Sequence, residues 1–207
     1  FLADIGSLHL RLIIDGDVHG TVDNLEMERF RIYSASRQTL IECAAHLSGL
    51  PVSAQTLATM KVRNLMTNTA DIATIISQVS PPTFKPESIM QLAPGQVFNF
   101  KGSINGFFED FVAYGDLTSD IGSVGIDAIF RSERMDGYEI MGFMKADNFN
   151  LGAFIGNKLF GDLSCDASVH LFTSPIPSYS FINLESLNID SFNLNNYTYS
   201  GISADGM

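Results

Sequence analysis

A hydrophobic period of two runs through most of the sequence and limits what the chain can fold into. Over residues 98–104 and 124–130, apolar residues alternate with polar or small ones. The same pattern recurs over residues 163–171. Successive side chains of a β-strand point to opposite faces of a sheet, so each run predicts a strand with one apolar face. We therefore expect a mainly β protein.

The connections between these runs indicate an antiparallel meander. Asn105-Gly106 and Asp136-Gly137 tolerate positive φ and are typical of two-residue hairpins. Further strands are predicted over residues 8–14, 25–34, 39–47, 57–65, 179–184, 187–194 and 197–202. The expected fold is an elongated, curved antiparallel β-sheet, groove-like or folded over as a β-taco, with one or two short amphipathic helices.

The period changes to that of a helix in one part of the chain, over residues 67–82. The apolar positions at i, i+3, i+4 and i+7 are Ile72, Ile75, Ile76 and Val79. Asp71 suits the first helical turn, and Pro81-Pro82 would end the helix. A second helical turn is predicted over residues 86–92, where proline stands at the first position. Both would cover an apolar surface.

These elements suggest three parts of one continuous unit. Residues 1–66 are expected to form an N-terminal β-meander, residues 67–95 a helical insert or cap, and residues 96–207 a C-terminal β-meander. The chain begins and ends within the strand pattern, and its first residues lack the basic segment and small-residue cleavage site of a signal peptide. We expect it to be an internal part of a longer protein.

Charge and composition exclude several classes of partner. The 207 residues include 12 basic and 23 acidic ones, for a net charge of −11, which repels nucleic acid and anionic lipid headgroups. A hydrophobic fraction of 45% with 16 phenylalanines is too high for a disordered chain. The longest uncharged run, residues 43–60, contains His46 and Pro51 and does not suit a membrane helix.

No pattern of reactive residues predicts chemistry. His9, His19, His46 and His170 lack a second ligand at metal-binding spacing and are expected at the surface. The acidic residues of 109–120 lack the spacing of an EF-hand, and the glycines of 122–125 do not form a phosphate loop. We therefore expect a protein that is not an enzyme, with no catalytic, metal or cofactor-binding residues.

The two cysteines lie far apart on strand-like runs. Two buried free thiols at Cys43 and Cys165 are favoured, and the sequence leaves a disulfide between them open. The cysteines therefore do not decide the compartment.

The phenylalanines crowd the middle of the chain, and two interpretations of them stay open. They fill an ordinary closed core, or some of them line an open surface that takes a fatty acyl chain, at about 0.8 kcal/mol per buried methylene. The candidate groove residues are Phe98, Phe100, Ile104, Val124, Ile126, Phe130, Val169 and Leu171.

The central and C-terminal segments resemble the AsmA/TamB family, in the TamB-like form of Bacteroidetes. The matching segments are FKGSINGFFEDFVAYGDLTSDIGSVGIDAIF (100–130), GYEIMGFMKADNFNLGAFIG (137–156), FGDLSCDASV (160–169) and NLNNYTYSGISADG (193–206). The upstream strand, the Gly-Leu-Pro break and the helix over 67–82 also look like those of the family. Asn150 stands where the family more often has an acidic residue.

This resemblance implies a function that the alternation itself does not. Members of the family span the periplasm from an inner-membrane anchor, which here would lie outside these residues. Their rolled sheet has a hydrophobic groove and is linked to phospholipid transport and to the assembly of outer-membrane proteins. The implied partners are phospholipid acyl chains and outer-membrane assembly proteins. The alternatives are a structural or adhesive β-sandwich or solenoid with a closed core, and a segment of an outer-membrane β-barrel.

Overall fold

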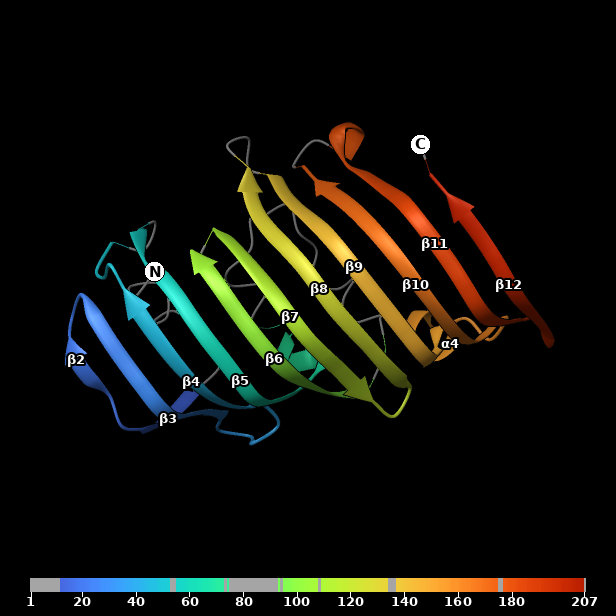
Figure 1. Ribbon diagram of the computed structural model, residues 1–207. Helices are drawn as coiled ribbons and strands as arrows, with labels where there is room; N and C mark the ends of the chain where they lie inside the picture. Colours follow the sequence, from blue (N-terminus) through green and yellow to red (C-terminus); the bar gives the residue numbers. More distant parts are fainter. Residues whose placement is uncertain are drawn as a thin grey trace.

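The computed structural model describes residues 12–52, 55–72, 74, 93, 95–107, 109–133, 137–174 and 177–206. Its described strands form one open, elongated and curved 12-stranded sheet (Figure 1). Eleven strands follow one another in the order β1-β3-β4-β5-β6-β7-β8-β9-β10-β11-β12, and β2 pairs with β3 beside β1. The mainly β, antiparallel fold predicted from alternation is confirmed.

Several strands, such as β5, β6, β8 and β10, extend beyond the runs that predict them. The first six strands are β1 (Leu12–Gly16), β2 (His19–Thr21), β3 (Asn24–Ser34), β4 (Leu40–Ser48), β5 (Leu57–Asn68) and β6 (Val97–Phe107). The others are β7 (Asp110–Ser119), β8 (Gly122–Glu133), β9 (Gly137–Asn150), β10 (Phe160–Thr173), β11 (Phe181–Leu194) and β12 (Tyr197–Asp205). The short helices α4 (Leu151–Ile155) and η2 (Pro177–Tyr179) flank β10.

The register gives the sheet two chemically different faces. One row of directly paired residues crosses the sheet through Ile14, Ile32, Ile41, Leu65, Phe100, Leu117, Val124, Ala146, Cys165, Ile189 and Ile202. Paired residues share a face, so this row defines what we name the apolar face. A row on the opposite, polar face runs through Lys101, Asp116, Gly125, Lys145, Asp166, Asn188 and Ser203.

The hairpin predicted at Asn105-Gly106 is wrong. Both residues lie inside β6, and the strand continues to Phe107, which pairs with Asp110 across the turn. Gly106 is needed for a different reason: a β-carbon there would overlap the backbone of the next strand at Asp110 and Phe111. The glycine therefore permits close approach of two strands and does not make a turn.

The three short strands predicted near the C-terminus are two long ones. Strand β11 is continuous from Phe181 to Leu194, although its pairing with β10 shifts register between Leu184 and Ser186. A bulge of this kind inserts a residue and reverses the phase of the alternation while the strand goes on. The change of phase therefore resembles a strand boundary in the sequence.

The helical insert falls partly outside the described residues. Residues 69–72 and 74 are helical, and the side chain of Asn68 accepts a hydrogen bond from the Asp71 amide at 2.8 Å, as an N-terminal cap does. The rest of the predicted helix, the second helical turn at 86–92 and the first residues of the predicted strand at 8–14 lie outside the described residues. Strands β5 and β6, on either side of the insert, pair directly.

A closed core lies where these helical residues meet the sheet. Phe98 and Ile121 are each 7% exposed and cluster with Ala93. The surrounding apolar side chains are Ile72, Leu117, Phe149 and Phe154. Phe154 comes from α4, whose N-cap Asn150 accepts a hydrogen bond from the Ala153 amide at 2.7 Å.

Candidate functional site

All eight candidate groove residues lie on the apolar face. Phe98, Phe100 and Ile104 come from β6, Val124, Ile126 and Phe130 from β8, and Val169 and Leu171 from β10. The intervening strands connect them, because Phe100 pairs with Leu117 and Leu117 with Val124. That these residues bind a ligand stays a prediction.

Two of the eight are enclosed by protein. Phe98 is 7% exposed in the core cluster that also contains Ala93 and Ile121. Val124 is 8% exposed and clusters with Ala146 and Cys165. The other six candidates are half-buried. A ligand on this face would contact those six, so we leave Phe98 and Val124 out of the proposed contact surface.

A row of small residues crosses the apolar face between larger ones. Ala113, Ala128 and Gly142 are directly paired on β7, β8 and β9, and Val169 on β10 extends the row. The neighbouring row on the same face consists of Phe111, Phe130, Ile140 and Leu171. The rings of Phe111 and Phe130 stack with centroids 4.9 Å apart. The face is therefore lined by a bulky row beside a small one, both running perpendicular to the strands.

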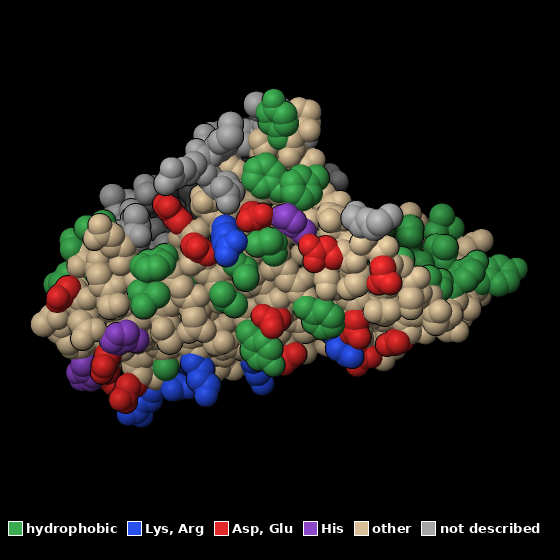
Figure 2. All heavy atoms as spheres, turned by 45° about the horizontal axis from the view of Figure 1, so that its top comes forward, with side chains coloured by type: hydrophobic (Ala, Val, Ile, Leu, Met, Phe, Trp, Pro, Cys, Tyr) green, Lys and Arg blue, Asp and Glu red, His purple; other side chains and the backbone are tan. Residues whose placement is uncertain are grey.

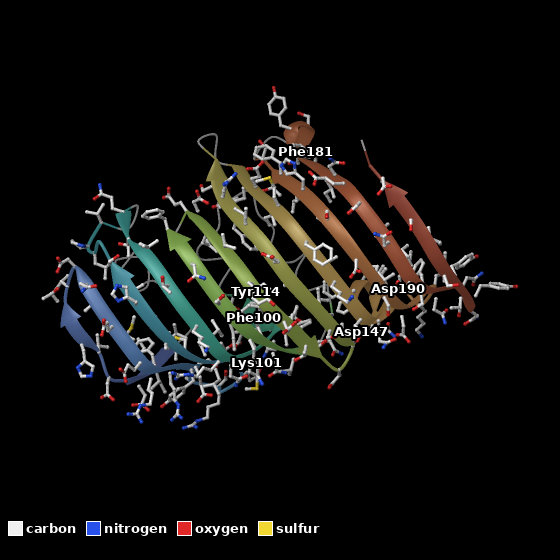
Figure 3. The ribbon with its side chains drawn as sticks, in the orientation of Figure 1. Phe100, Lys101, Tyr114, Asp147, Phe181 and Asp190 are labelled. Carbon is white, nitrogen blue, oxygen red and sulfur yellow. The ribbon has the colours of Figure 1, made fainter. Side chains whose placement is uncertain are left out.

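Phe100 packs flat on the sheet. Gly102 and Gly115 are paired on β6 and β7, and a β-carbon on either would lie 2.8 Å from the Cζ atom of Phe100. The ring therefore lies over two glycines, which leave room that any other residue would fill. Figure 3 labels Phe100 and its neighbour Lys101 on β6.

Both cysteines are buried free thiols on the apolar face. Burial raises the pKa of Cys43, although the Arg63 guanidinium acts in the opposite direction. Burial also raises the pKa of Cys165, opposed by a hydrogen bond with the backbone of Ala146. The thiols lie on β4 and β10, six strand spacings or about 29 Å apart along the sheet, which is too far for a disulfide. The predicted free thiols are confirmed.

We predict that both thiols react slowly with a disulfide reagent in the folded protein. A raised pKa lowers the thiolate fraction at pH 8, and the thiolate is the reacting species. Labelling by Ellman's reagent at pH 8 should be at least about tenfold slower in buffer than in guanidinium chloride. Equal rates in the two solvents would contradict the burial of Cys43 and Cys165.

The polar face carries ion pairs between adjacent strands. His170 Nε2 lies 2.7 Å from Glu139 Oε1, and Arg131 Nε lies 3.6 Å from Asp110 Oδ1. Lys145 Nζ lies 3.4 Å from Asp166 Oδ1. Figure 2 shows acidic, basic and histidine side chains close together on the surface, with hydrophobic side chains between them. Partly exposed pairs of this kind contribute little to stability, so the apolar face and the backbone ladder hold the sheet together.

Within the described residues, His, Cys, Asp and Glu side chains do not gather in groups of three or more that could hold a metal ion. His46 and His170 lie on the polar face, where His46 pairs with Glu26 and His170 pairs with Met141 on the adjacent strands. A shallow depression on the same face of β3, β4 and β5 is lined by Glu26, His46 and Lys61.

Sequence reasoning missed two sets of residues. The small row on the apolar face was not singled out, because alanine and glycine carry little hydrophobic signal by themselves. A group of apolar residues on the polar face of β7–β9 was also missed. Its signal in the sequence is the unbroken run Phe111-Val112-Ala113-Tyr114, which is apolar on both faces of the strand.

The described structure defines a class of protein: an open antiparallel meander in one layer, with one apolar and one polar face. The helices among the described residues are too short or too polar to cross a membrane. Comparisons with protein-family models, with curated proteins and with solved structures found no match.

Proposed function

We propose that this chain is a non-enzymatic segment of a cell-envelope module that carries phospholipid acyl chains on its apolar face. The observation that supports this most directly is the apolar row that passes without a polar residue from Ile14 on β1 to Ile202 on β12. The half-buried state of Phe100, Ile126 and Phe130 also supports it, because large apolar side chains are partly accessible there.

The length of the small row suits one acyl chain, and the contacts would come from Phe130 and Leu171 in the row beside it, because Ala128 is only 7% exposed. From Ala113 on β7 to Val169 on β10 the row crosses three strand spacings, or about 14 Å. One acyl chain occupies about half of the ~30 Å hydrocarbon core of a bilayer, which is a similar length. About a dozen methylenes at ~0.8 kcal/mol each would offset extraction of the lipid from a membrane.

The cellular setting rests on the resemblance to the AsmA/TamB family. We propose a periplasmic location, with an inner-membrane anchor elsewhere in the parent protein. Transport of phospholipid between membranes is the leading role, and a contribution to the assembly of outer-membrane proteins is the second, since both need a surface that shields apolar groups from water. The two thiols of the apolar face, Cys43 and Cys165, are buried and have raised pKa values, which disfavours the reactive thiolate.

The test is direct detection of lipid on the purified protein. Native mass spectrometry of the freshly purified chain should show bound phospholipid, and the delipidated chain should take up a fluorescent phospholipid from vesicles. Fluorescence of the label should rise in proportion to protein until one binding equivalent is reached. A chain that carries no lipid and leaves the fluorescence of the label unchanged would overturn the proposal.

A structural or adhesive role without a ligand is the competing function, and one observation favours it. Phe98 and Val124 are already enclosed by protein side chains, as in an ordinary core. If the remaining apolar face were sealed in the same way, an apolar dye such as ANS would not bind to the folded chain. Saturable dye binding that phospholipid displaces favours the lipid carrier.

A further inference from the structure

A compact group of apolar side chains lies on the polar face, on three adjacent strands. Val112, Ile129 and Met141 form one row of direct pairs across β7, β8 and β9. In the next row, Asp127 on β8 pairs with Tyr114 on one side and with Phe143 on the other. We name the five apolar residues of these two rows the polar-face island: Val112, Tyr114, Ile129, Met141 and Phe143.

The island is open to solvent. Tyr114 is 64% exposed, Phe143 45% and Val112 39%. Figure 3 labels Tyr114 in the middle of the sheet, away from its edges. A strand in the middle of a sheet has its backbone fully paired, so exposed aromatic rings there do not protect an edge. Tyrosine, phenylalanine and methionine are also the residues enriched at the centres of protein interfaces.

Charged residues surround the island as a polar rim. On one side, Arg131 forms two ion pairs: its Nε atom lies 3.6 Å from Asp110 Oδ1, and its Nη1 atom lies 4.0 Å from Glu139 Oε2. On the other side, Lys145 pairs with Asp166 at 3.4 Å. An apolar centre within a polar, charged rim is the usual arrangement of a protein interface.

The carboxylate of Asp127 differs from the rim. It is exposed and lies between the two aromatic residues of its row, and the two basic side chains of the rim, Arg131 and Lys145, form ion pairs with other carboxylates. A partner that covered the island would also remove this carboxylate from water, which costs several kcal/mol unless a cation replaces the lost solvation. The partner must therefore bring a cation to Asp127.

We infer that the polar-face island binds a segment of a partner protein that presents a lysine or arginine side chain between apolar ones. The cation pairs with Asp127 and lies against the rings of Tyr114 and Phe143, where cation–π attraction adds to the ion pair. The apolar side chains of the partner cover Val112, Ile129 and Met141. The net charge of −11 assists the approach of such a basic segment. This surface is opposite the apolar face, so the inference does not depend on the proposed lipid function.

The test uses the whole chain and three synthetic peptides in which leucine alternates with arginine, with citrulline or with glutamate. We expect the arginine peptide to bind and to shift the amide resonances of β7–β9 in NMR spectra. The citrulline peptide, which lacks only the charge, should bind at least about tenfold more weakly. Asp127→Asn should lower the affinity for the arginine peptide by at least about tenfold. Asp127→Lys should make the chain bind the glutamate peptide instead of the arginine peptide.

The matched control is Asp116→Asn, an exposed carboxylate on the same face that lies one row away beside Lys101. We expect it to change the affinity for the arginine peptide by less than about twofold. Equal effects of the Asp116 and Asp127 substitutions would mean diffuse charge attraction and would overturn the inference. Three other results would also overturn the inference. The arginine peptide could fail to bind, or it could shift only the amide resonances of residues on the apolar face. The third is that the chain binds phosphatidylcholine vesicles and Asp127→Asn abolishes that binding.

Discussion

Replacing Phe130 by aspartate should reduce phospholipid loading by at least about tenfold. Phe130 lies on the apolar face, stacked on Phe111 and beside the small row that passes through Ala128. A carboxylate there would be removed from water by an acyl chain, at a cost of several kcal/mol, and tenfold in affinity needs only about 1.4 kcal/mol. Uptake of fluorescent phospholipid by the delipidated variant measures the effect, and Ile126→Asp should act in the same way.

The control for this prediction is the next residue along the strand. Ile129 is half-buried like Phe130 but projects from the polar face, where it pairs with Val112. Ile129→Asp should leave phospholipid loading within about twofold of the parent if the apolar face binds the lipid. Circular dichroism must show that both variants stay folded. Lipid loading by Phe130→Asp equal to that of the parent would remove the support for an acyl-chain site.

A single added methyl group at Gly102 should destabilise the fold by about 3 kcal/mol or more. A β-carbon there would overlap the carbonyl oxygen of Tyr114 and lie 2.8 Å from both the Gly115 Cα atom and the Phe100 ring. Two of these three obstacles are backbone atoms of the adjacent strand, which cannot move without breaking the ladder between β6 and β7. Urea denaturation of Gly102→Ala measures the loss in the free energy of unfolding.

Gly125→Ala provides the comparison, since it adds the same methyl group to the same sheet. A β-carbon at Gly125 would have its nearest neighbour, Asp116 Oδ1, at 3.6 Å, which is ordinary van der Waals contact. Its effect should stay within about 1 kcal/mol and could be stabilising, because alanine restricts the unfolded chain. Equal losses for the two variants would contradict the close approach of β6 and β7 at Gly102.

Alternation predicts the two faces of the sheet because the side-chain period of a strand is independent of the rest of the fold. The spacing alone predicts that Phe100, Ile126 and Val169 lie on the apolar side of their strands, and the register places all three on one face. The neighbour-to-neighbour order of the strands also follows where the connections are short, because a meander then leaves few alternatives.

Turn positions and enclosure could not be predicted in the same way. Asn105-Gly106 has the composition of a hairpin turn, but it lies inside β6, where the glycine lets two strands approach closely. The strands turn after Phe107, where the sequence has no dipeptide typical of a hairpin turn. Phe98 and Phe100 have identical alternation, yet Phe98 is enclosed because Ala93 and Ile72 pack on it. Contacts of this kind join residues that are distant in sequence, so a local pattern contains no information about them.

The nearest-neighbour order of the strands also determines how the molecule would respond to force. Each strand from β4 to β11 pairs with the strands before and after it in sequence, β12 pairs with β11, and β1 and β2 both pair with β3. Tension applied between β1 and β12 would therefore peel the outermost hairpin first and load its hydrogen bonds one after another. Extension in an optical trap should proceed at low force through a series of small steps, each releasing one hairpin, and the sheet should reform by the same steps when the tension is relaxed.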